Sequence, residues 1–296
     1  MKTLFILNSA SGKLRKDKGC GFVQKIHSIA PEFRLSPEIV ITQAPRHAVE
    51  LARQAVNEGV EQIVAVGGDG TMNEVAQGVV GTDAILGLIP MGSGNGLGRH
   101  LGICGSLNSM MEILSEGGVK TIDTGTVNGI PFFNVMGIGF DAEMSQGFNS
   151  LPKRGLSGYL RVGLKLFMRY QPQTYILECE ERTKHEIEAW LIAVANSAQF
   201  GNQAYIAPKA EVDDGLLDLT ALRLSHRLGA IPLALRLFAK NIDKSKAAHT
   251  KRGCSFKIYR QQPGIIHTDG EVHKTTAELS IHVRPGSLKI KVPSRL

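Results

Sequence analysis

The chain has few cysteines, few aromatic residues and no long apolar run. Its four cysteines form no CxxC pair and no metal-ligand spacing with histidine, which argues against a metal site held by thiolates. We expect these thiols to be reduced and mostly buried, as in a cytoplasmic protein. The apolar run at residues 4–7 is far too short for a signal peptide, and no stretch approaches the roughly 18 apolar residues of a membrane-spanning helix.

Several nucleotide-binding signatures are also missing. The chain contains no GxxxxGK[ST] loop, no HRD or DFG string and no loop that fits GxGxxG. Aromatic residues make up 6% and no RNA- or DNA-binding motif occurs, so nucleic acid is a poor partner. A hydrophobic fraction of 43% is typical of a globular protein. The net charge of +7 favours anionic partners such as phosphates or an acidic membrane surface.

The first 120 residues alternate short apolar runs with helical patterns. The pattern predicts strands at 4–7, 39–42, 63–66 and 85–89, and helices at 47–58, 72–80 and 107–115. Strands alternating with helices predict βαβ units and a parallel sheet. Ligands of such sheets bind beyond the carboxyl ends of the strands. We assign residues 1–121 to this α/β domain.

The texture changes near residue 119, where short alternating runs separated by turn signals begin. Strands are predicted at 132–135, 175–180, 189–195, 217–222, 256–259, 279–283 and 288–292, and helices at 157–170 and 228–240. The turn signals are Asn128-Gly129, Asp214-Gly215 and Pro285-Gly286. Residues 122–296 are therefore predicted to form a second, mostly antiparallel β domain with helical insertions.

Two glycine-rich loops follow consecutive strands of the first domain. They are Val66-Gly67-Gly68-Asp69-Gly70-Thr71-Met72-Asn73-Glu74 and Pro90-Met91-Gly92-Ser93-Gly94-Asn95-Gly96. Glycine lets the backbone approach a ligand closely, and the N–H groups at a helix start favour phosphate. Asp69 brings negative charge into such a cradle, which makes sense if it faces a metal ion or a substrate hydroxyl; a helix N-cap is the alternative. Ser93 and Asn95 are candidate donors to a phosphoryl group.

Six motifs resemble, in order, the diacylglycerol kinase catalytic family of bacterial lipid kinases, which includes sphingosine-kinase-like members. The motifs are Asn8-Ser9-Ala10-Ser11-Gly12-Lys13, the loop from Gly67 to Val75, Pro90 to Asn95, Asp123-Thr124-Gly125, Asp213 to Asp218, and Asp269-Gly270-Glu271. Two positions depart from the family pattern. Gly96 stands where many diacylglycerol-type members have Asp, which is closer to the sphingosine-kinase-like members and leaves the lipid open. Ser9 stands where the family often has Pro.

The resemblance implies a fold, an activity and partners. The implied fold is a parallel-sheet α/β domain that binds the nucleotide, residues 1–121, followed by an antiparallel β-sandwich domain that binds the lipid, residues 122–296. The active site would lie in the cleft between them. The implied activity is ATP- and Mg²⁺-dependent transfer of the γ-phosphoryl group to a hydroxyl of diacylglycerol or a sphingoid-type base. We expect a cytoplasmic protein that meets its lipid substrate peripherally at an anionic membrane surface, and we leave a homodimer open.

The resemblance also assigns residues. Glu271 would be the general base, Asp69 would organise phosphates and magnesium, and Lys13 would neutralise phosphate charge. Further nucleotide-binding positions are Asn8, Thr42, Gly67, Gly68, Gly70, Thr71, Asn73, Glu74, Gly92, Ser93 and Asn95. A structural Mg²⁺ would be held by the Glu211 and Leu216 carbonyls with the Asp214 carboxylate.

Physical chemistry bears on two of these assignments. Asp269 and Glu271 flank one glycine in a predicted strand, which would put both carboxylates on one face and raise the pKa of one of them by repulsion. A solvent-facing β-turn is the alternative. Carboxylate and carbonyl oxygens around Asp214 suit a hard cation such as Mg²⁺. A plain hairpin turn is the alternative there, and the sequence alone favours it.

The segment 157–170 has the pattern of a basic amphipathic helix. Arg161, Lys165 and Arg169 are spaced four apart and share one face, while Leu160, Leu164 and Phe167 lie on another. Such a helix could rest on anionic lipid. The alternative is a helix that covers the β domain and has a solvated basic face.

Two other functions compete with the lipid kinase. An NAD-kinase-like enzyme shares the GGDGT loop and the two-domain plan, but its second loop normally has the sequence Thr-Gly-Ser-Thr-Ala-Tyr, which Pro90 to Asn95 fits poorly. A catalytically silent lipid- or nucleotide-binding regulator is the other alternative. The presence of both Asp69 and Glu271 argues against it, because a silent protein needs neither carboxylate.

Overall fold

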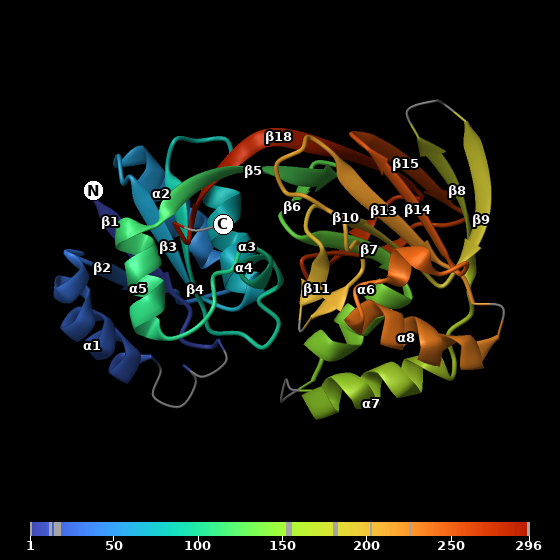
Figure 1. The fold of residues 1–296 in the computed structure, drawn as a ribbon, viewed down its shortest axis with the longest axis horizontal. Helices are drawn as coiled ribbons and strands as arrows, with labels where there is room; N and C mark the ends of the chain where they lie inside the picture. Colours follow the sequence, from blue (N-terminus) through green and yellow to red (C-terminus); the bar gives the residue numbers. More distant parts are fainter. Residues whose placement is uncertain are drawn as a thin grey trace. The chain divides into compact units, whose positions relative to one another are not determined.

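The computed structural model describes residues 2–11, 14, 19–151, 156–179, 183–201, 203–224 and 226–294. Lys13, predicted to neutralise phosphate charge, lies outside these residues. The chain forms two compact units, Met1–Ile122 with Gly286–Leu296 and Asp123–Pro285. The return of the C-terminal segment to the first unit was not predicted from the sequence. Figure 1 labels the helices and strands.

The first unit is built on a parallel sheet. Its strands lie in the order β2 (Glu38–Ile41), β1 (Thr3–Leu7), β3 (Gln62–Gly67) and β4 (Ile85–Pro90), all parallel. The C-terminal part of β18 (Glu278–Val292) adds a parallel strand beside β4 through Lys289 and Ile290. β1 and β3 are buried at every position because they consist almost entirely of aliphatic and aromatic residues. The predicted parallel sheet is therefore present.

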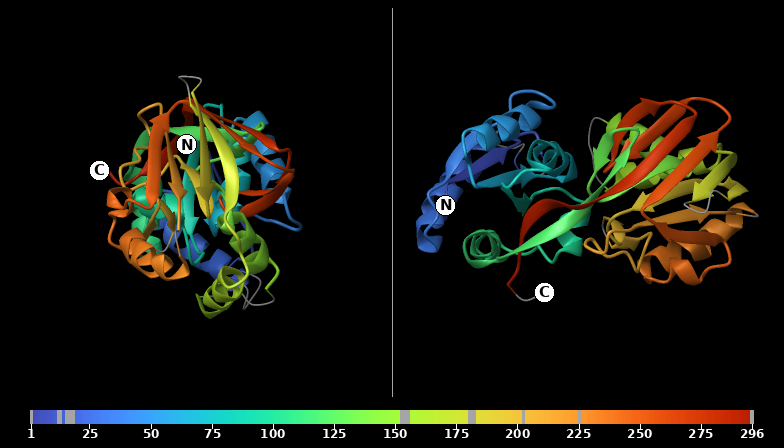
Figure 2. Two further views of the ribbon diagram at one scale, coloured as in Figure 1. Left: turned by 90° about the vertical axis from the view of Figure 1, so that its right-hand side faces the viewer. Right: turned by 90° about the horizontal axis from the view of Figure 1, so that it is seen from above.

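Helices cover both faces of this sheet. They are α1 (Cys20–Ile29), α2 (His47–Asn57), α3 (Asp69–Val79), α4 (Gly96–His100) and α5 (Leu107–Glu116), with a 3₁₀ turn at Ala30–Phe33. α1 and α5 bury Ile26, Met110 and Met111 against Phe5 and Val64 of the sheet. α2 and α3 pack together on the opposite face (Figure 2). Each helix packs on the sheet through one face because its apolar residues recur at helical spacing.

The second unit is a sandwich of two antiparallel sheets. One has the order β14 (Ala248–Gly253), β13 (Leu217–Leu222), β10 (Leu191–Ala195), β7 (Val135–Gly139), β16 (Gly264–Thr268) and β17 (Glu271–Thr275). The other contains the N-terminal part of β18 with β15 (Ser255–Arg260), β8 (Gln173–Cys179) and β9 (Lys184–Ala189). β5 (Gly118–Val127) pairs with β18 and with β6 (Ile130–Phe132).

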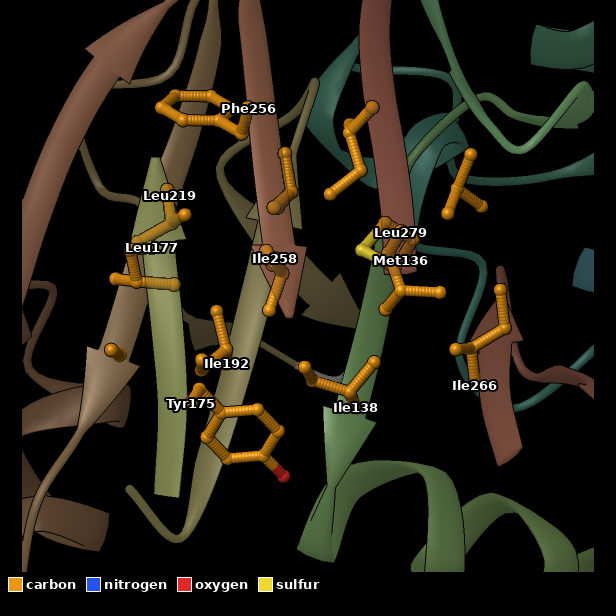
Figure 3. Packing of buried hydrophobic residues seen from close by; sticks show 14 of the residues in the cluster. Met136, Ile138, Tyr175, Leu177, Ile192, Leu219, Phe256, Ile258, Ile266 and Leu279 are labelled. Atoms are coloured by element: carbon orange, nitrogen blue, oxygen red, sulfur yellow. The ribbon is translucent and has the colours of Figure 1, made fainter. Parts of the chain in front are cut away.

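The inner faces of the two sheets form the core of the second unit. Met136, Ile138 and Ile192 of one sheet meet Leu177 and Ile258 of the other (Figure 3). Alternate residues of each strand supply this layer, as expected for a sandwich. Smaller elements complete the unit: α6 (Phe140–Asn149), α7 (Leu156–Phe167), α8 (Ala230–Phe238) and the short pair β11 (Gln199–Gly201) and β12 (Ala204–Tyr205).

Two predictions about local structure away from the candidate site were wrong. Pro285-Gly286 is not a turn between two strands, because β18 runs without a break from Glu278 to Val292 and accommodates Gly286 at φ 56°. The cysteines are free as predicted but not mostly buried: Cys20, Cys104 and Cys254 are exposed.

Candidate functional site

Four predicted segments meet at the carboxyl edge of the parallel sheet. Asn8 follows β1, Thr42 follows β2, and the two glycine-rich loops follow β3 and β4. The Asn8 N–H donates to the Val66 carbonyl at 3.1 Å, and the Thr42 N–H donates to the Leu7 carbonyl at 2.9 Å. Backbone bonds thus bring Asn8 and Thr42 to the edge where ligands of parallel sheets bind.

Asp69 joins the two glycine-rich loops. Its Oδ2 accepts the Asn95 N–H at 2.8 Å and its Oδ1 accepts the Gly96 N–H at 2.8 Å. The carboxylate therefore satisfies N–H groups at the start of α4, although it belongs to a different helix. Burial raises the pKa of Asp69, while the bonds from Asn95 and Gly96 and the charge of Arg99 oppose the rise. The negative charge of Asp69, which is unexpected in a phosphate-binding loop, is thus stabilised by the backbone N–H groups of Asn95 and Gly96.

Glycine is required where the loops touch. A Cβ on Gly68 would lie 3.3 Å from the Gly92 Cα, and a Cβ on Gly92 would lie 2.8 Å from the Gly68 Cα. The Met91 N–H also donates to the Gly67 carbonyl at 2.6 Å. A side chain at Gly92 would push the loops apart and pull on the Asp69 bridge.

Other predicted nucleotide-binding residues shape the loops and helices. The Asn95 side chain bonds Gly92 twice, accepting its N–H at 3.1 Å and donating to its carbonyl at 2.8 Å. Buried Thr71 lies 3.2 Å from the Ser11 hydroxyl, which links the first motif to the GGDGT loop. Asn73 accepts from the Gln77 amide at 2.6 Å.

Glu74 is directed toward α2. Its Oε2 accepts the Ala48 N–H at 3.3 Å, in the first turn of that helix. This contact holds α2 against α3. Nucleotide contacts by Glu74, Asn73 and Asn95 stay predictions, and the contacts described here show their structural roles. A small pocket between the loops is lined by Ala65, Gly67, Gly68, Asp69, Met72, Leu88, Pro90, Asn95 and Gly98.

The Asp269-Gly270-Glu271 motif forms the turn of a β-hairpin and the start of its second strand, and the prediction that it lies in one strand was wrong. Asp269 and Gly270 have φ values of 52° and 87° and form the turn between β16 and β17, while Glu271 opens β17 opposite Thr268. Two successive residues with positive φ are typical of a two-residue hairpin turn, for which Asp-Gly is a preferred sequence. The two carboxylates therefore do not share a strand face.

Asp269 has a structural role in this hairpin. Its Oδ1 accepts the N–H groups of Asn134 and Val135 at 2.9 and 3.0 Å, and its Oδ2 accepts the N–H of Phe133 at 2.9 Å. Phe133 and Asn134 form the break between β6 and β7, and Val135 is the first residue of β7, whereas the sequence predicted one strand over 132–135. The carboxylate thus ties the turn to the neighbouring strand and fixes where Glu271 begins β17.

A buried histidine beneath the turn pairs with an aspartate that sequence reasoning missed. The His267 Nε2 lies 2.6 Å from the Asp141 Oδ2, and the His267 Nδ1 accepts the Gly270 N–H at 3.3 Å. Asn149 donates to the Gly270 carbonyl at 2.9 Å. Burial lowers the pKa of His267, but the charge of Asp141 and its hydrogen bond outweigh this and raise it. No sequence signal points to Asp141, because it lies 126 residues from its partner.

In the segment predicted to hold a structural metal, residues 211–218, a carboxylate pairs with Arg252. Asp214 forms an ion pair with Arg252 and accepts the Leu216 N–H at 3.0 Å. Arg252 also lies 3.4 Å from the Asp218 carboxylate. Across the residues that the structure describes, no group of three or more His, Cys, Asp or Glu side chains could hold one ion. The Asp214 carboxylate thus pairs with a guanidinium, and the set of the Glu211 and Leu216 carbonyls with the Asp214 carboxylate stays a prediction.

The predicted basic helix forms as α7. Arg161 and Lys165 of α7 are exposed, as the spacing requires; Arg169 is exposed too, but it lies beyond the end of the helix at Phe167, whereas the sequence predicted a helix over 157–170. Its apolar residues do not act alike: Phe167 packs on Trp190 with ring centroids 5.1 Å apart, while Leu164 is 67% exposed. In the described part of the chain no helix has both the length and the apolar character to cross a membrane.

Comparison with known proteins identifies the family. Residues 2–127 match the diacylglycerol kinase catalytic domain, and residues 134–292 match the YegS C-terminal NAD kinase beta sandwich-like domain. The "Probable lipid kinase YegS" of Salmonella paratyphi A is 30% identical over 244 residues, which cover 79% of each chain. The "Probable lipid kinase YegS-like" of Chromohalobacter salexigens is 32% identical over 181 residues, covering 59% of this chain and 58% of the relative.

Two further proteins are similar, one in sequence and one in fold. The "Uncharacterized protein sll0036" of Synechocystis is 30% identical over 268 residues, covering 87% of this chain and 62% of the relative. The chain thus spans about three fifths of that protein and of the Chromohalobacter relative. A crystal structure of a diacylglycerol kinase from Bacillus anthracis superposes with a TM-score of 0.74 at 19% identity, covering 98% of this chain and 96% of that one.

The chain therefore belongs to the diacylglycerol kinase catalytic-domain family, with a YegS-type β-sandwich as its second domain. The predicted family is confirmed. The predicted fold class, a parallel α/β domain followed by an antiparallel sandwich, is confirmed as well.

Proposed function

We propose that this protein is an ATP-dependent lipid kinase that transfers the γ-phosphoryl group to the hydroxyl of diacylglycerol or a sphingoid-type base. The observation that carries the proposal is the Asp69 bridge, which holds two glycine-rich loops together at the carboxyl edge of the parallel sheet. Phosphoryl transfer depends mainly on positioning and on charge neutralisation. A pair of loops fixed against each other supplies the positioning, because their backbone N–H groups keep one arrangement.

In this proposal the first domain, residues 1–121, binds the nucleotide. Asn8, Thr42 and the two loops would surround the phosphates, and Lys13 would neutralise their charge. Asp69 would organise the phosphates with the Mg²⁺ that accompanies ATP. Its bonds to Asn95 and Gly96 support this role, since they hold the carboxylate in one orientation.

The second domain would bind the lipid and present Glu271 as the general base. A lipid hydroxyl is a poor nucleophile at neutral pH, so a carboxylate within hydrogen-bond reach assists its deprotonation. The hairpin supports this assignment, because Asp269, His267 and Asn149 all hold the turn that precedes Glu271.

The lipid substrate implies contact with a membrane. We propose a cytoplasmic protein that associates peripherally with an anionic membrane through the exposed basic residues Arg161 and Lys165 of α7 and Arg169 just after it. Basic residues near an anionic surface contribute about 1 kcal/mol each. Charge reversal at Arg161 and Lys165 should weaken vesicle binding in low salt and have little effect in high salt. Unchanged binding in low salt would remove α7 from the membrane contact.

The test of the activity is purified protein with labelled ATP and a panel of acceptors. Transfer of label to diacylglycerol or a sphingoid base supports the proposal, and the acceptor with the highest kcat/KM identifies the lipid class. Transfer to NAD would instead select the NAD-kinase-like alternative. No labelled product with any acceptor would favour the silent regulator. Each assay is repeated with Glu271→Gln to show that the label transfer belongs to this chain.

A further inference from the structure

Helix α8 exposes an apolar ridge to solvent. Leu228, just before the helix, is 76% exposed, and Ile231, Leu235 and Phe238 are 63%, 67% and 59% exposed. Spacings of three and four residues place these four side chains in one stripe. We call this stripe the α8 ridge.

The ridge is not the face that holds α8 on the protein. Leu233 is buried, and Leu237 packs beside it in the core below. The helix thus has apolar residues on both sides. Single exposed apolar side chains are ordinary on protein surfaces, but a contiguous group of large ones marks an interaction surface.

Charge around the ridge indicates the partner. Residues 226–246 contain Arg227, Arg236, Lys240, Lys244 and Lys246 against a single acidic residue, Asp243. Asp243 is itself paired with Lys209 at 2.9 Å. The guanidinium of Arg236 is directed to the Asn241 carbonyl at 3.4 Å, so it does not interrupt the ridge. An apolar stripe within a segment rich in basic residues is the composition of an interfacial helix on anionic lipid.

We propose that the α8 ridge inserts into the surface of an anionic membrane, which deepens the proposed lipid-kinase function and rests on it. A second copy of the chain fits the surface less well. A symmetric dimer places the same patch on both subunits, so it would bring the basic surroundings of one ridge against those of the other. An anionic headgroup layer instead neutralises these charges while the ridge reaches the acyl boundary.

The ridge and α7 would contribute differently. Attraction of exposed basic residues is screened by salt, whereas burial of apolar side chains is not. The α8 contribution should therefore remain in high salt. This separates it from the contribution of Arg161 and Lys165.

The first experiment measures flotation with vesicles of phosphatidylcholine mixed with phosphatidylglycerol, in high salt. Each leucine-sized side chain contributes a factor of about ten or more to partitioning, so Ile231→Ser/Leu235→Ser should reduce binding at least about tenfold. The control is Val119→Ser, a single replacement of an apolar side chain by Ser at a position that is 48% exposed in the other unit. It should bind like the wild type. Circular dichroism checks that all variants are folded.

The second experiment places a fluorescent side chain on the ridge. In Phe238→Trp, emission should shift to the blue on adding the same vesicles and should be quenched by brominated lipid. The chain has one tryptophan, Trp190, which is 6% exposed and supplies a constant background. An unshifted emission would overturn the proposal.

The remaining outcomes separate the ridge from the kinase activity. Wild-type binding by Ile231→Ser/Leu235→Ser would overturn the ridge proposal whatever the enzyme assay shows. The ridge proposal would also be overturned if the wild type were a dimer, and if this variant were monomeric but still bound vesicles like the wild type. The activity is measured separately with labelled ATP and a short-chain, water-soluble acceptor, to which the variant should transfer phosphate at the wild-type rate. If the wild type phosphorylates no acceptor, the proposed function fails, and the flotation comparison still decides the role of the ridge.

Discussion

Replacing Asp69 with Asn tests whether this carboxylate joins the two glycine-rich loops. Asn retains one acceptor oxygen, but its NH₂ group would face the second backbone N–H, so one of the bonds at 2.8 Å is lost and two donors oppose each other. A hydrogen bond to a charged group is worth about 1.5–3 kcal/mol, and an unsatisfied donor adds to its loss. We expect the free energy of unfolding of the first unit to fall by about 2–4 kcal/mol.

The effect should be visible in both stability and activity. Urea denaturation gives the change in the free energy of unfolding, and titration with ATP gives the change in affinity of the loops. Transfer of the phosphoryl group should fall at least about a hundredfold if Asp69 also organises the phosphates. The matched control is Asp83→Asn in the same unit, which removes a fully exposed partner of Lys289. It should leave both measurements unchanged, because exposed ion pairs contribute little. If Asp69→Asn has the stability and the ATP affinity of the wild type, the Asp69 carboxylate does not hold the two loops together.

Three further predictions concern the hairpin of the second unit. The pKa of His267 is raised in the folded state, so this residue stabilises the fold fully below its unfolded pKa of about 6.5 and loses this contribution as the pH rises through its folded pKa. Asp141→Asn should flatten the dependence of the free energy of unfolding on pH, measured by urea denaturation. An unchanged pH dependence would contradict the pairing of His267 with Asp141. Asp269→Ala leaves three backbone N–H groups without their acceptor and should lower the free energy of unfolding by about 3 kcal/mol or more, whereas a loss below about 1 kcal/mol would show that the carboxylate is not the anchor. Glu271→Gln should lower kcat at least about a hundredfold with little change in stability, and near-normal turnover would remove Glu271 from the mechanism.

The regular elements of the first unit were predictable because their signals are local. Runs such as Leu4 to Leu7 and Ile63 to Val66 are buried strands in the structure, and the loops after them occupy the expected edge. The glycines of the GGDGT loop predict a candidate site at this edge. The local sequence could not show that Asp69 accepts hydrogen bonds from the N–H groups of Asn95 and Gly96, because these residues lie 26 and 27 positions further along the chain.

Errors in the second unit arose where turn chemistry or distant contacts decide the backbone. The alternation around Asp269-Gly270 predicts a strand, but Asp-Gly is also a strong two-residue hairpin signal, and both residues adopt positive φ. Pro285-Gly286 predicts a turn, but β18 continues through it. The roles of Asp141 and Arg252 depend on partners 126 and 38 residues away, which no local pattern reveals.

The C-terminal part of β18 affects how the family's catalytic domain can be isolated. A fragment that stops near residue 122 would lack Lys289 and Ile290, which pair with β4. The backbone N–H and C=O groups on that side of β4 would then be open to pairing with another chain, and such unprotected edges promote aggregation. A soluble recombinant version of the first unit should therefore carry residues 286–294 joined through a linker, as a permuted chain.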